Sequence, residues 1–239
     1  LGLRAVPSSA TLRQRLDTHA PSWFERVDAL NAAVLNLRIQ GQPIDFGALS
    51  CGYLPLDIDT FAMDNSGTAK EHVGRTYAGV DGYCPLAAYL GTQGFCLELA
   101  LRPGTQHSAS ETEYNIERVL PLAAQVTATT TTNAMPLLVR ADAGFDSAKL
   151  MCAIDQQAAA LKREVAFIIK WNPRSTAVET LASQRAADTG TTWATLREGK
   201  RACVWTEHLT LSHGTHSVAV RRICRLTERT VDKRGQQML

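Results

Sequence analysis

The sequence predicts an α/β protein built on one mixed sheet, with a helical N-terminal segment before the sheet and a β-rich region after it. Two patterns support this prediction. Apolar runs separated by short turns fill residues 52–102. They are typical of an antiparallel meander, because parallel crossovers need longer connections. Helical and strand patterns then alternate over residues 110–169. The expected order of the core is therefore β-β-β-α-β-α-β.

The composition bounds the size and the compartment. With 239 residues, of which 45% are hydrophobic, the chain is long enough for one full core and a small second domain. Its 25 basic and 23 acidic residues neither require nor exclude a nucleic-acid partner. The six cysteines form no C-x-x-C pair, which favours free thiols in a reducing cytoplasm. No apolar run reaches the length of a membrane span and no signal peptide is recognised, while the first residue, Leu1, indicates processing or truncation.

The N-terminal segment is predicted to be helical over residues 9–39. Ser9 is a suitable cap, and Pro21–Ser22 predict a break. After this break, apolar residues recur at three- and four-residue spacing and form one face: Trp23, Val27, Leu30, Val34 and Leu37. A packing helix is favoured over a DNA contact through Arg13, Arg15 and Arg26.

The core is expected to begin with a strand from Leu54 to Met63. Turns follow at Asp64–Gly67, Gly79–Gly82 and Gly91–Gly94. Ser110–Glu113 resembles a capping box, which begins a helix expected to reach Gln125. The second half then holds a strand over Met135–Val139, a helix capped by Ser147 and a strand over Val165–Ile169.

Residues 174–239 are predicted to form a separate β-rich region of short alternating strands, with turns at Glu198–Gly199 and His213–Gly214. Its end, from Arg221 to Arg234, is basic. Two interpretations of this end stay open. One is a strand edge that follows phosphates, and the other is a solvated edge whose charges prevent aggregation.

Acidic side chains mark the ends of two predicted strands. Asp57 and Asp59 are two residues apart on the first, so both point to one face. Asp142 follows the Met135–Val139 strand. If the two strands lie in one parallel sheet, Asp59 and Asp142 meet at its edge. Paired carboxylates there favour a hard divalent cation such as Mg²⁺, which prefers oxygen ligands.

Several motifs resemble those of a known family. They are Leu56-Asp-Ile-Asp-Thr60, Gly79-Val-Asp-Gly-Tyr83, Leu101-Arg-Pro-Gly104 and Arg140-Ala-Asp-Ala-Gly-Phe-Asp-Ser147, of which the last is the most specific. The family they resemble is the DDE transposases of the IS4/IS1380-like insertion-sequence group. The resemblance implies three parts: an N-terminal helical subdomain at 1–50, an RNase H-like catalytic core at 51–173, and a β-rich insertion at 174–239.

The resemblance also assigns roles to residues. It implies Asp59 as the first catalytic acid, with Asp57 as the alternative, and Asp142 as the second. The family's third acid is a Glu on a helix with the pattern Tyr-x-x-Arg-x-x-x-Glu-x-x-x-x-x-x-Lys. Glu228 does not fit this pattern, so the chain is expected to be a partial transposase that stops before that helix. The implied cofactor is Mg²⁺, replaceable by Mn²⁺, in a two-metal site that Asp59 bridges.

The implied activity is cut-and-paste transposition, by metal-dependent cleavage and strand transfer of double-stranded DNA. The implied partners are the terminal inverted repeats and the target DNA, bound by a homodimer at the nucleoid of a bacterial cytoplasm, with no membrane involved. Candidate DNA contacts are Arg140, Lys170, Arg174, Arg221 and Arg222. For Arg140, an ion pair with Asp142 is the alternative.

Two other functions stay open. Asp57-Ile-Asp59 and Asp142-Ala-Gly-Phe-Asp146 also resemble the motifs of haloacid-dehalogenase-like Mg-dependent phosphatases. That fold needs parallel crossovers, whereas this chain predicts a meander after the first motif. The second alternative is a catalytically dead remnant that keeps the fold and binds DNA.

Overall fold

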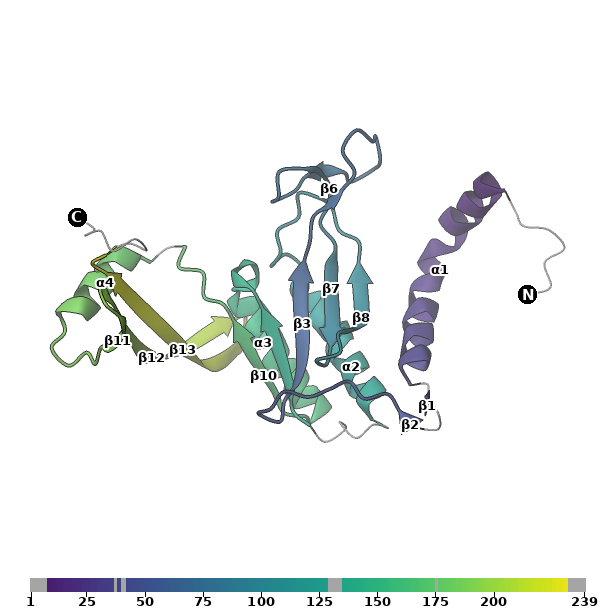
Figure 1. Ribbon diagram of the computed structural model, residues 1–239. Coiled ribbons are helices and arrows are strands. Elements are labelled where there is room, and N and C mark those ends of the chain that lie inside the picture. Colours follow the sequence, from purple (N-terminus) through teal and green to yellow (C-terminus); the bar gives the residue numbers. More distant parts are fainter. Residues whose placement is uncertain (1–7, 37, 40–41, 129–134, 175, 232–239) are drawn as a thin grey trace.

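The computed structural model describes residues 8–36, 38–39, 42–128, 135–174 and 176–231. Figure 1 shows a central sheet with a long helix, α1 (Ser9–Leu35), on one side. A long hairpin of β12 (Lys200–His213) and β13 (His216–Arg229) extends from the other side. The central sheet carries the candidate acids, so its topology decides where they lie.

The central sheet has five strands. From one edge to the other, they are β10 (Val165–Ile169), β9 (Leu137–Ala141), β3 (Leu54–Thr60), β7 (Leu86–Leu90) and β8 (Phe95–Ala100). β3, β7 and β8 form an antiparallel meander, and β9 and β10 run parallel to β3. The mixed α/β sheet predicted from the sequence is therefore confirmed, although β9 lies two residues later than expected.

Two helices cover one face of this sheet. α2 (Thr112–Thr127) connects β8 to β9, α3 (Ala148–Leu161) connects β9 to β10, and both lie behind the sheet in Figure 1. Because side chains alternate along a strand, Leu54, Leu56 and Ile58 of β3 point into the core formed with these helices. Asp57 and Asp59 consequently point to the opposite face. Ile168 of β10 lies on that face as well and is 62% exposed.

β3 ends at Thr60, before the predicted end at Met63. The chain continues into a small sheet of β4 (Met63–Asp64), β6 (Asp81–Tyr83) and β5 (Gly74–Arg75), which stands beyond the end of β3 in Figure 1. Met63 pairs with Tyr83 there, so the predicted long strand is divided between two sheets. The Tyr77 hydroxyl donates to the Thr60 carbonyl at 3.2 Å and ties the small sheet to the end of β3.

The connection from β7 to β8 depends on a glycine. Gly91 begins the predicted turn with φ +75°, a conformation that L side chains rarely adopt. A Cβ at this position would lie 1.8 Å from the Phe46 carbonyl oxygen. The close approach holds the segment before β3 against the end of β7.

α1 is one continuous helix, so the break predicted at Pro21–Ser22 is wrong. Proline removes a single hydrogen-bond donor, and the Ser22 hydroxyl donates to the His19 carbonyl at 2.8 Å in the same turn. The cap is Ser8 rather than Ser9, because the Ser8 hydroxyl accepts from the Thr11 amide at 3.2 Å.

The last turns of α1 pack on the core. Ala32 and Leu35 are buried, and Asn31 donates to the Leu97 carbonyl at 2.7 Å. Much of the predicted apolar face is nevertheless exposed, as Leu30 is at 65%. The helix also ends before residue 39, because β1 (Arg38–Ile39) pairs with β2 (Gln42–Pro43) in a small hairpin, and Leu37 lies outside the described residues.

The predicted capping box at the start of α2 is absent. The N-cap residue is Glu111, with φ 59°, and its side chain forms no capping hydrogen bond. The Thr112 hydroxyl instead donates back to the Ser108 carbonyl at 2.5 Å. Ser147 is the N-cap residue of α3 as predicted, although its hydroxyl makes no capping hydrogen bond either.

The region after β10 has longer strands than the sequence predicts. β12 and β13 are each 14 residues long, and β11 (Ala194–Arg197) pairs with β12. Turns at 198–199 and 214–215 lie at or next to the predicted positions. α4 (Val178–Ala187) was not predicted. It buries none of its residues, so no apolar stripe marks it in the sequence.

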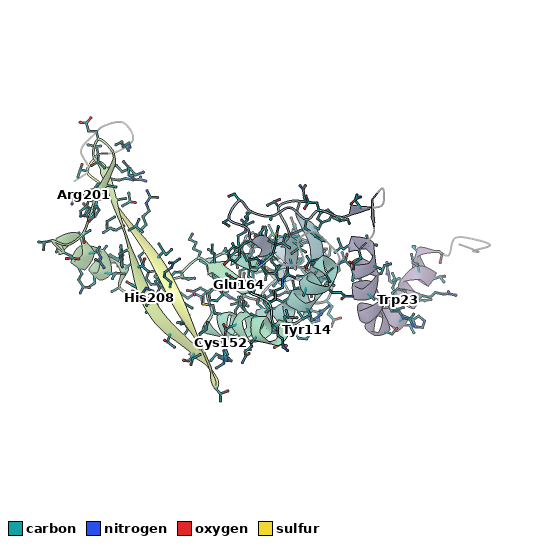
Figure 2. All side chains as sticks on the ribbon, turned by 90° about the horizontal axis from the view of Figure 1, so that it is seen from below. Trp23, Tyr114, Cys152, Glu164, Arg201 and His208 are labelled. Carbon is teal, nitrogen blue, oxygen red and sulfur yellow. The ribbon has the colours of Figure 1, made fainter. Side chains whose placement is uncertain are left out.

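The hairpin is attached to the core through its end. Val218 of β13 packs against Met151 and Cys152 of α3, and Figure 2 labels Cys152 next to this contact. The His216 imidazole adds a 2.9 Å contact with the Asp155 carboxylate. Of the predicted basic end, Lys233 and Arg234 lie outside the described residues. Among the helices that are described, none combines the length and apolarity that a membrane crossing requires.

Candidate active site

The register of the central sheet places Asp59 beside Asp142. β3 and β9 are parallel neighbours, and Asp57 is paired with Arg140. The recorded pairs end there and β9 ends at Ala141; continued by two residues, the same register brings Asp59 level with Asp142 on one face. Neighbouring strands lie about 4.8 Å apart. The continued register thus favours the predicted meeting of the two acids at the carboxyl ends of two parallel strands.

Asp57 and Arg140 form an ion pair one row before these acids. The Arg140 guanidinium donates from Nε to one Asp57 oxygen at 2.5 Å and from a terminal nitrogen to the other at 2.6 Å. The Asp57 hydrogen bond raises the pKa of the Arg140 guanidinium. Arg140 therefore pairs with Asp57 and not with Asp142, the partner considered from the sequence. Both Asp57 oxygens are occupied by this contact.

Asp59 and Asp142 use only part of their hydrogen-bonding capacity. The Asp59 Oδ1 atom accepts from the Thr60 amide at 2.7 Å. The Asp142 Oδ1 atom accepts from the Gly144 amide at 2.8 Å, at the start of the 3₁₀ helix η1 (Ala143–Phe145). Both residues are exposed, and within the described residues neither Oδ2 atom has a hydrogen-bond partner. Each carboxylate therefore keeps one oxygen available for a ligand.

A loop between β8 and α2 supports both acids. The Ser108 hydroxyl lies 2.8 Å from the Thr60 hydroxyl, directly after Asp59. A Cβ on Gly144 would lie 3.1 Å from Ser108, which shows how closely Ser108 also approaches the turn after Asp142. Neither the composition nor the spacing of this loop indicates that Ser108 lies between the two acidic motifs.

Arg102 holds this loop in shape. It is 5% exposed and donates to the carbonyl oxygens of His107 at 2.5 Å and Ser110 at 3.2 Å. Burial lowers the pKa of its guanidinium. Arg102 lies in the Leu101-Arg-Pro-Gly104 motif, so the sequence marked its position but not its structural role.

Two of the predicted DNA contacts lie at the same end of the sheet. β10 continues the row of acids, because Ile169 pairs with Ala141 and the next residues are Lys170 and Asp142. Asp59, Asp142 and Lys170 thus follow one another across three strands. Arg174 lies further along the same loop, with its guanidinium 3.3 Å from the His107 imidazole.

The other two predicted contacts, Arg221 and Arg222, lie on β13 in the hairpin. Arg222 is 4.2 Å from the centre of the Trp171 ring and 3.3 Å from the Glu207 carboxylate. Arg221 is on the other face of the strand. Glu228, weighed as a third acid, binds Arg201 in the same hairpin at 2.7 Å.

No group of three or more His, Cys, Asp or Glu side chains within the described residues is arranged to hold a metal ion. Within those residues, no third side chain of these types therefore joins Asp59 and Asp142 in a metal-binding group. Asp146, the next acid in the second motif, does not join them. Its carboxylate accepts from the Asn172 amide at 2.8 Å and connects the loops after β9 and β10.

Comparison with known proteins identifies the family of the chain. The model of the family described as "Transposase DDE domain group 1" matches residues 5–229. No curated protein matches the sequence. A solved structure, the piggyBac transposase synaptic complex with hairpin DNA, is 8% identical with a TM-score of 0.34. The match covers 64% of this chain and 30% of that chain, a likeness too weak to support an argument.

The chain belongs to the family of transposase DDE domains. This family is one of polynucleotidyl transferase-type enzymes, which generally use divalent metal ions. The phosphatase alternative is not favoured, because that fold continues from its first motif through parallel crossovers. Here β3 leads into antiparallel β7 and β8.

Proposed function

We propose that this chain carries the first two acids of a transposase active site, Asp59 and Asp142, and takes part in cut-and-paste cleavage and strand transfer of DNA. One observation carries the proposal. The β3–β9 register, continued by two residues, favours a position of the two carboxylates side by side at the carboxyl ends of parallel strands, and each has an oxygen left for a ligand. This is where open α/β sheets generally bind their ligands.

The proposal includes the finer classification. The strand order β10-β9-β3-β7-β8, with a meander and two helix-linked parallel strands, supports an RNase H-like core at 51–173. A helical subdomain at 1–50 and a β-rich insertion at 174–239 complete the proposed domains. The motifs around Asp59 and Asp142 support the IS4/IS1380-like group within the transposases.

The donor set fits a divalent metal ion. Two exposed carboxylates in adjacent positions supply the oxygen ligands that Mg²⁺ and Mn²⁺ prefer. Bound metal would activate a water molecule or a 3′-hydroxyl and stabilise the leaving oxygen of a phosphodiester. Asp59 and Asp142 hold the metal in this proposal, and Asp57 does not, because Arg140 occupies both of its oxygens.

The basic residues near the acids have a separate role in the proposal. Lys170 follows Asp142 in the same row, and Arg174 lies beyond it, so both are placed to contact a phosphate that approaches the acids. The partner is double-stranded DNA, with the ends of the element and the target as substrates. A homodimer at the bacterial nucleoid would bring two such sites together.

The test is metal binding, measured with Mn²⁺ by electron paramagnetic resonance and by anomalous scattering from soaked crystals. We expect Asp59→Asn and Asp142→Asn each to weaken Mn²⁺ binding by more than about tenfold. Asp57→Asn is the matched control, because it removes the same charge from the same face. Its Mn²⁺ affinity should stay within about threefold of the parent.

Two results would count against the proposal. Mn²⁺ affinity that survives replacement of both Asp59 and Asp142 would mean that they are not the ligands. If Asp57→Asn weakened Mn²⁺ binding more than the other two substitutions do, the metal site would lie at Asp57, two residues earlier on β3. Nicking of a supercoiled plasmid in Mn²⁺ then separates an active enzyme from a remnant, since a remnant would bind metal without cutting DNA.

A further inference from the structure

The two faces of the β12–β13 hairpin have different surroundings. The register alternates inner and outer positions along the two strands. Inner side chains such as Cys203, Trp205 and Val218 pack on neighbouring elements and are buried or half-buried. The outer side chains between residues 204 and 225 are all exposed: Val204, Thr206, His208, Thr210, Ser212, Ser217, Ala219, Arg221, Ile223 and Arg225. Figure 2 shows the hairpin standing clear of the core along most of its length, with His208 labelled near its middle.

Arginines on the inner face are used by the fold. Arg201 binds Glu228 at 2.7 Å and lies 4.2 Å from the centre of the Trp193 ring. Arg222 has the equivalent pair of partners in Glu207 and Trp171. Each inner arginine therefore has a carboxylate and an aromatic ring of its own.

Arginines on the outer face have no such partners. Arg221, Arg225 and Arg229 are exposed, and none of them has an ion pair within the described residues. No Asp or Glu lies on the outer positions of either strand. Arg229 even stands directly opposite Lys200, and like charges in this position destabilise a ribbon. Without an acidic partner among the described residues, these charges are available to an external anion.

The spacing of these arginines matches an extended polyanion. They recur at every fourth residue of one strand, so neighbours are separated by roughly 14 Å and the first and last by roughly 27 Å. That length corresponds to about eight base pairs of duplex DNA at ~3.4 Å per pair. A two-stranded ribbon also fits the major groove of B-DNA, which is about 12 Å wide.

We infer that the outer face of this hairpin binds the phosphate backbone of duplex DNA through Arg221, Arg225 and Arg229. The inference rests on the proposed function, and it adds a DNA-binding surface separate from the acids. The inference also gives different roles to two neighbouring arginines, both of which the sequence predicts as DNA contacts. Arg221 contacts DNA, whereas Arg222 holds the hairpin to Trp171 and the loop after β10. The outer residues between the arginines, Ile223 and Thr227, offer no bidentate donor pair to a base edge, which suits a contact that does not select a base sequence.

The test compares binding of the full chain to a 30-base-pair duplex at several salt concentrations, with EDTA present so that no metal-dependent cleavage occurs. The double variant Arg221→Ala/Arg225→Ala should bind at least about tenfold more weakly at low salt. Its slope of log K against log salt should become shallower by about 2, because two phosphate contacts are lost. Fluorescence anisotropy gives both quantities.

Two matched variants control for charge and folding. Arg221→Lys/Arg225→Lys keeps both charges, so its salt slope should equal that of the parent. Arg13→Ala/Arg15→Ala removes the same charge from α1, at the opposite side of the molecule in Figure 1, and should leave the slope unchanged. Unchanged thermal unfolding of the alanine pair would show that the hairpin still folds.

Three outcomes would overturn the inference: an unchanged slope in the hairpin alanine pair, an equal loss in the α1 pair, or arginine-dependent binding to phosphatidylserine vesicles without binding to the duplex. The proposed function is judged separately. If the parent nicks DNA in Mn²⁺ and the hairpin variant keeps its slope, the hairpin inference fails alone. If the slope changes but Asp59 and Asp142 do not bind Mn²⁺, the proposed function fails alone.

Discussion

Replacing Arg140 by Ala tests the arrangement of charges on the open face of the sheet. Arg140 and Asp57 form a two-point ion pair in which both side chains are about 40% exposed, at 41% and 40% respectively. Exposed pairs contribute about 0.2–1 kcal/mol. The geometry here is bidentate and only partly solvated, so the upper end, about 1 kcal/mol, is the appropriate figure.

The same substitution leaves Asp57 without its positive partner on the face that also carries Asp59. Asp57 and Asp59 are two residues apart on one face of β3, roughly 7 Å along the strand. Two unit charges at that distance repel by about 1 kcal/mol at an effective dielectric constant of ~40–50, which lies between bulk water and the protein surface. This repulsion is present in the parent as well, so Arg140→Ala should lower the free energy of unfolding by about 1 kcal/mol, the contribution of the lost ion pair.

Asp57→Asn should behave differently, although it breaks the same ion pair. It removes one of the repelling carboxylates, so the loss and the gain roughly cancel, and the change should stay within about 0.5 kcal/mol. Adding Asp57→Asn to Arg140→Ala should recover about 1 kcal/mol. Urea unfolding of the four proteins gives these values, and Arg140→Ala should lower Tm by about 2–4 °C.

The stabilities of the same four proteins can also be compared in the presence of a divalent metal ion. Mn²⁺ or Mg²⁺ bound by Asp59 and Asp142 would neutralise the charge next to Asp57, so the deficit of Arg140→Ala should shrink when metal is added. Equal stability of Arg140→Ala and the double variant would refute the reasoning, because it would show that the carboxylates do not repel one another across these positions.

Two further predictions concern packing and are measured by urea unfolding. Gly91→Ala should lower the free energy of unfolding by more than about 2 kcal/mol, because the new Cβ would lie 1.8 Å from the Phe46 carbonyl oxygen. Gly94→Ala is the control. Gly94 has a similar φ and nothing within 4 Å of a built Cβ, so its replacement should cost only about 1 kcal/mol. Val218→Ala should loosen the hairpin from α3 and lower the free energy of unfolding by about 1–2 kcal/mol. Proteolysis between residues 176 and 231 should then be faster than in the parent. Val204→Ala is the control and should change little, because Val204 is 63% exposed.

The sheet was predictable because its signals are local. The strands are short apolar runs, the turns contain glycine at positions such as Gly79 and Gly91, and the lengths of the connections separate a meander from helical crossovers. The continuity of α1 was not predictable in the same way. Whether Pro21 ends the helix depends on the other hydrogen bonds of the helix, because proline removes only one donor. The helix continues from Ser9 to Leu35.

The candidate site was predictable only up to the register. The sequence places Asp57, Asp59, Arg140 and Asp142 near strand ends, but it does not say which acid lies opposite which residue. A shift of one residue would move every side chain of β3 to the other face. The partner of Arg140 was therefore open until the pairing of Asp57 with Arg140 was known. Ser108 could not be found at all, because its contacts with both motifs arise from the path of a loop.

The register also explains why two acids so close in sequence differ in what they can do. In the first row, Asp57 meets Arg140, and the pair is neutral within itself. In the second row, Asp59 meets Asp142, two like charges that the protein leaves exposed with one free oxygen each among the described residues. Lys170 follows only at the far side of Asp142. An external divalent cation would balance this second row, and a phosphate brought to that cation would meet Lys170 next. The arrangement of charge across three neighbouring strands thus leads from the Asp57–Arg140 pair, through the proposed metal, to the proposed DNA.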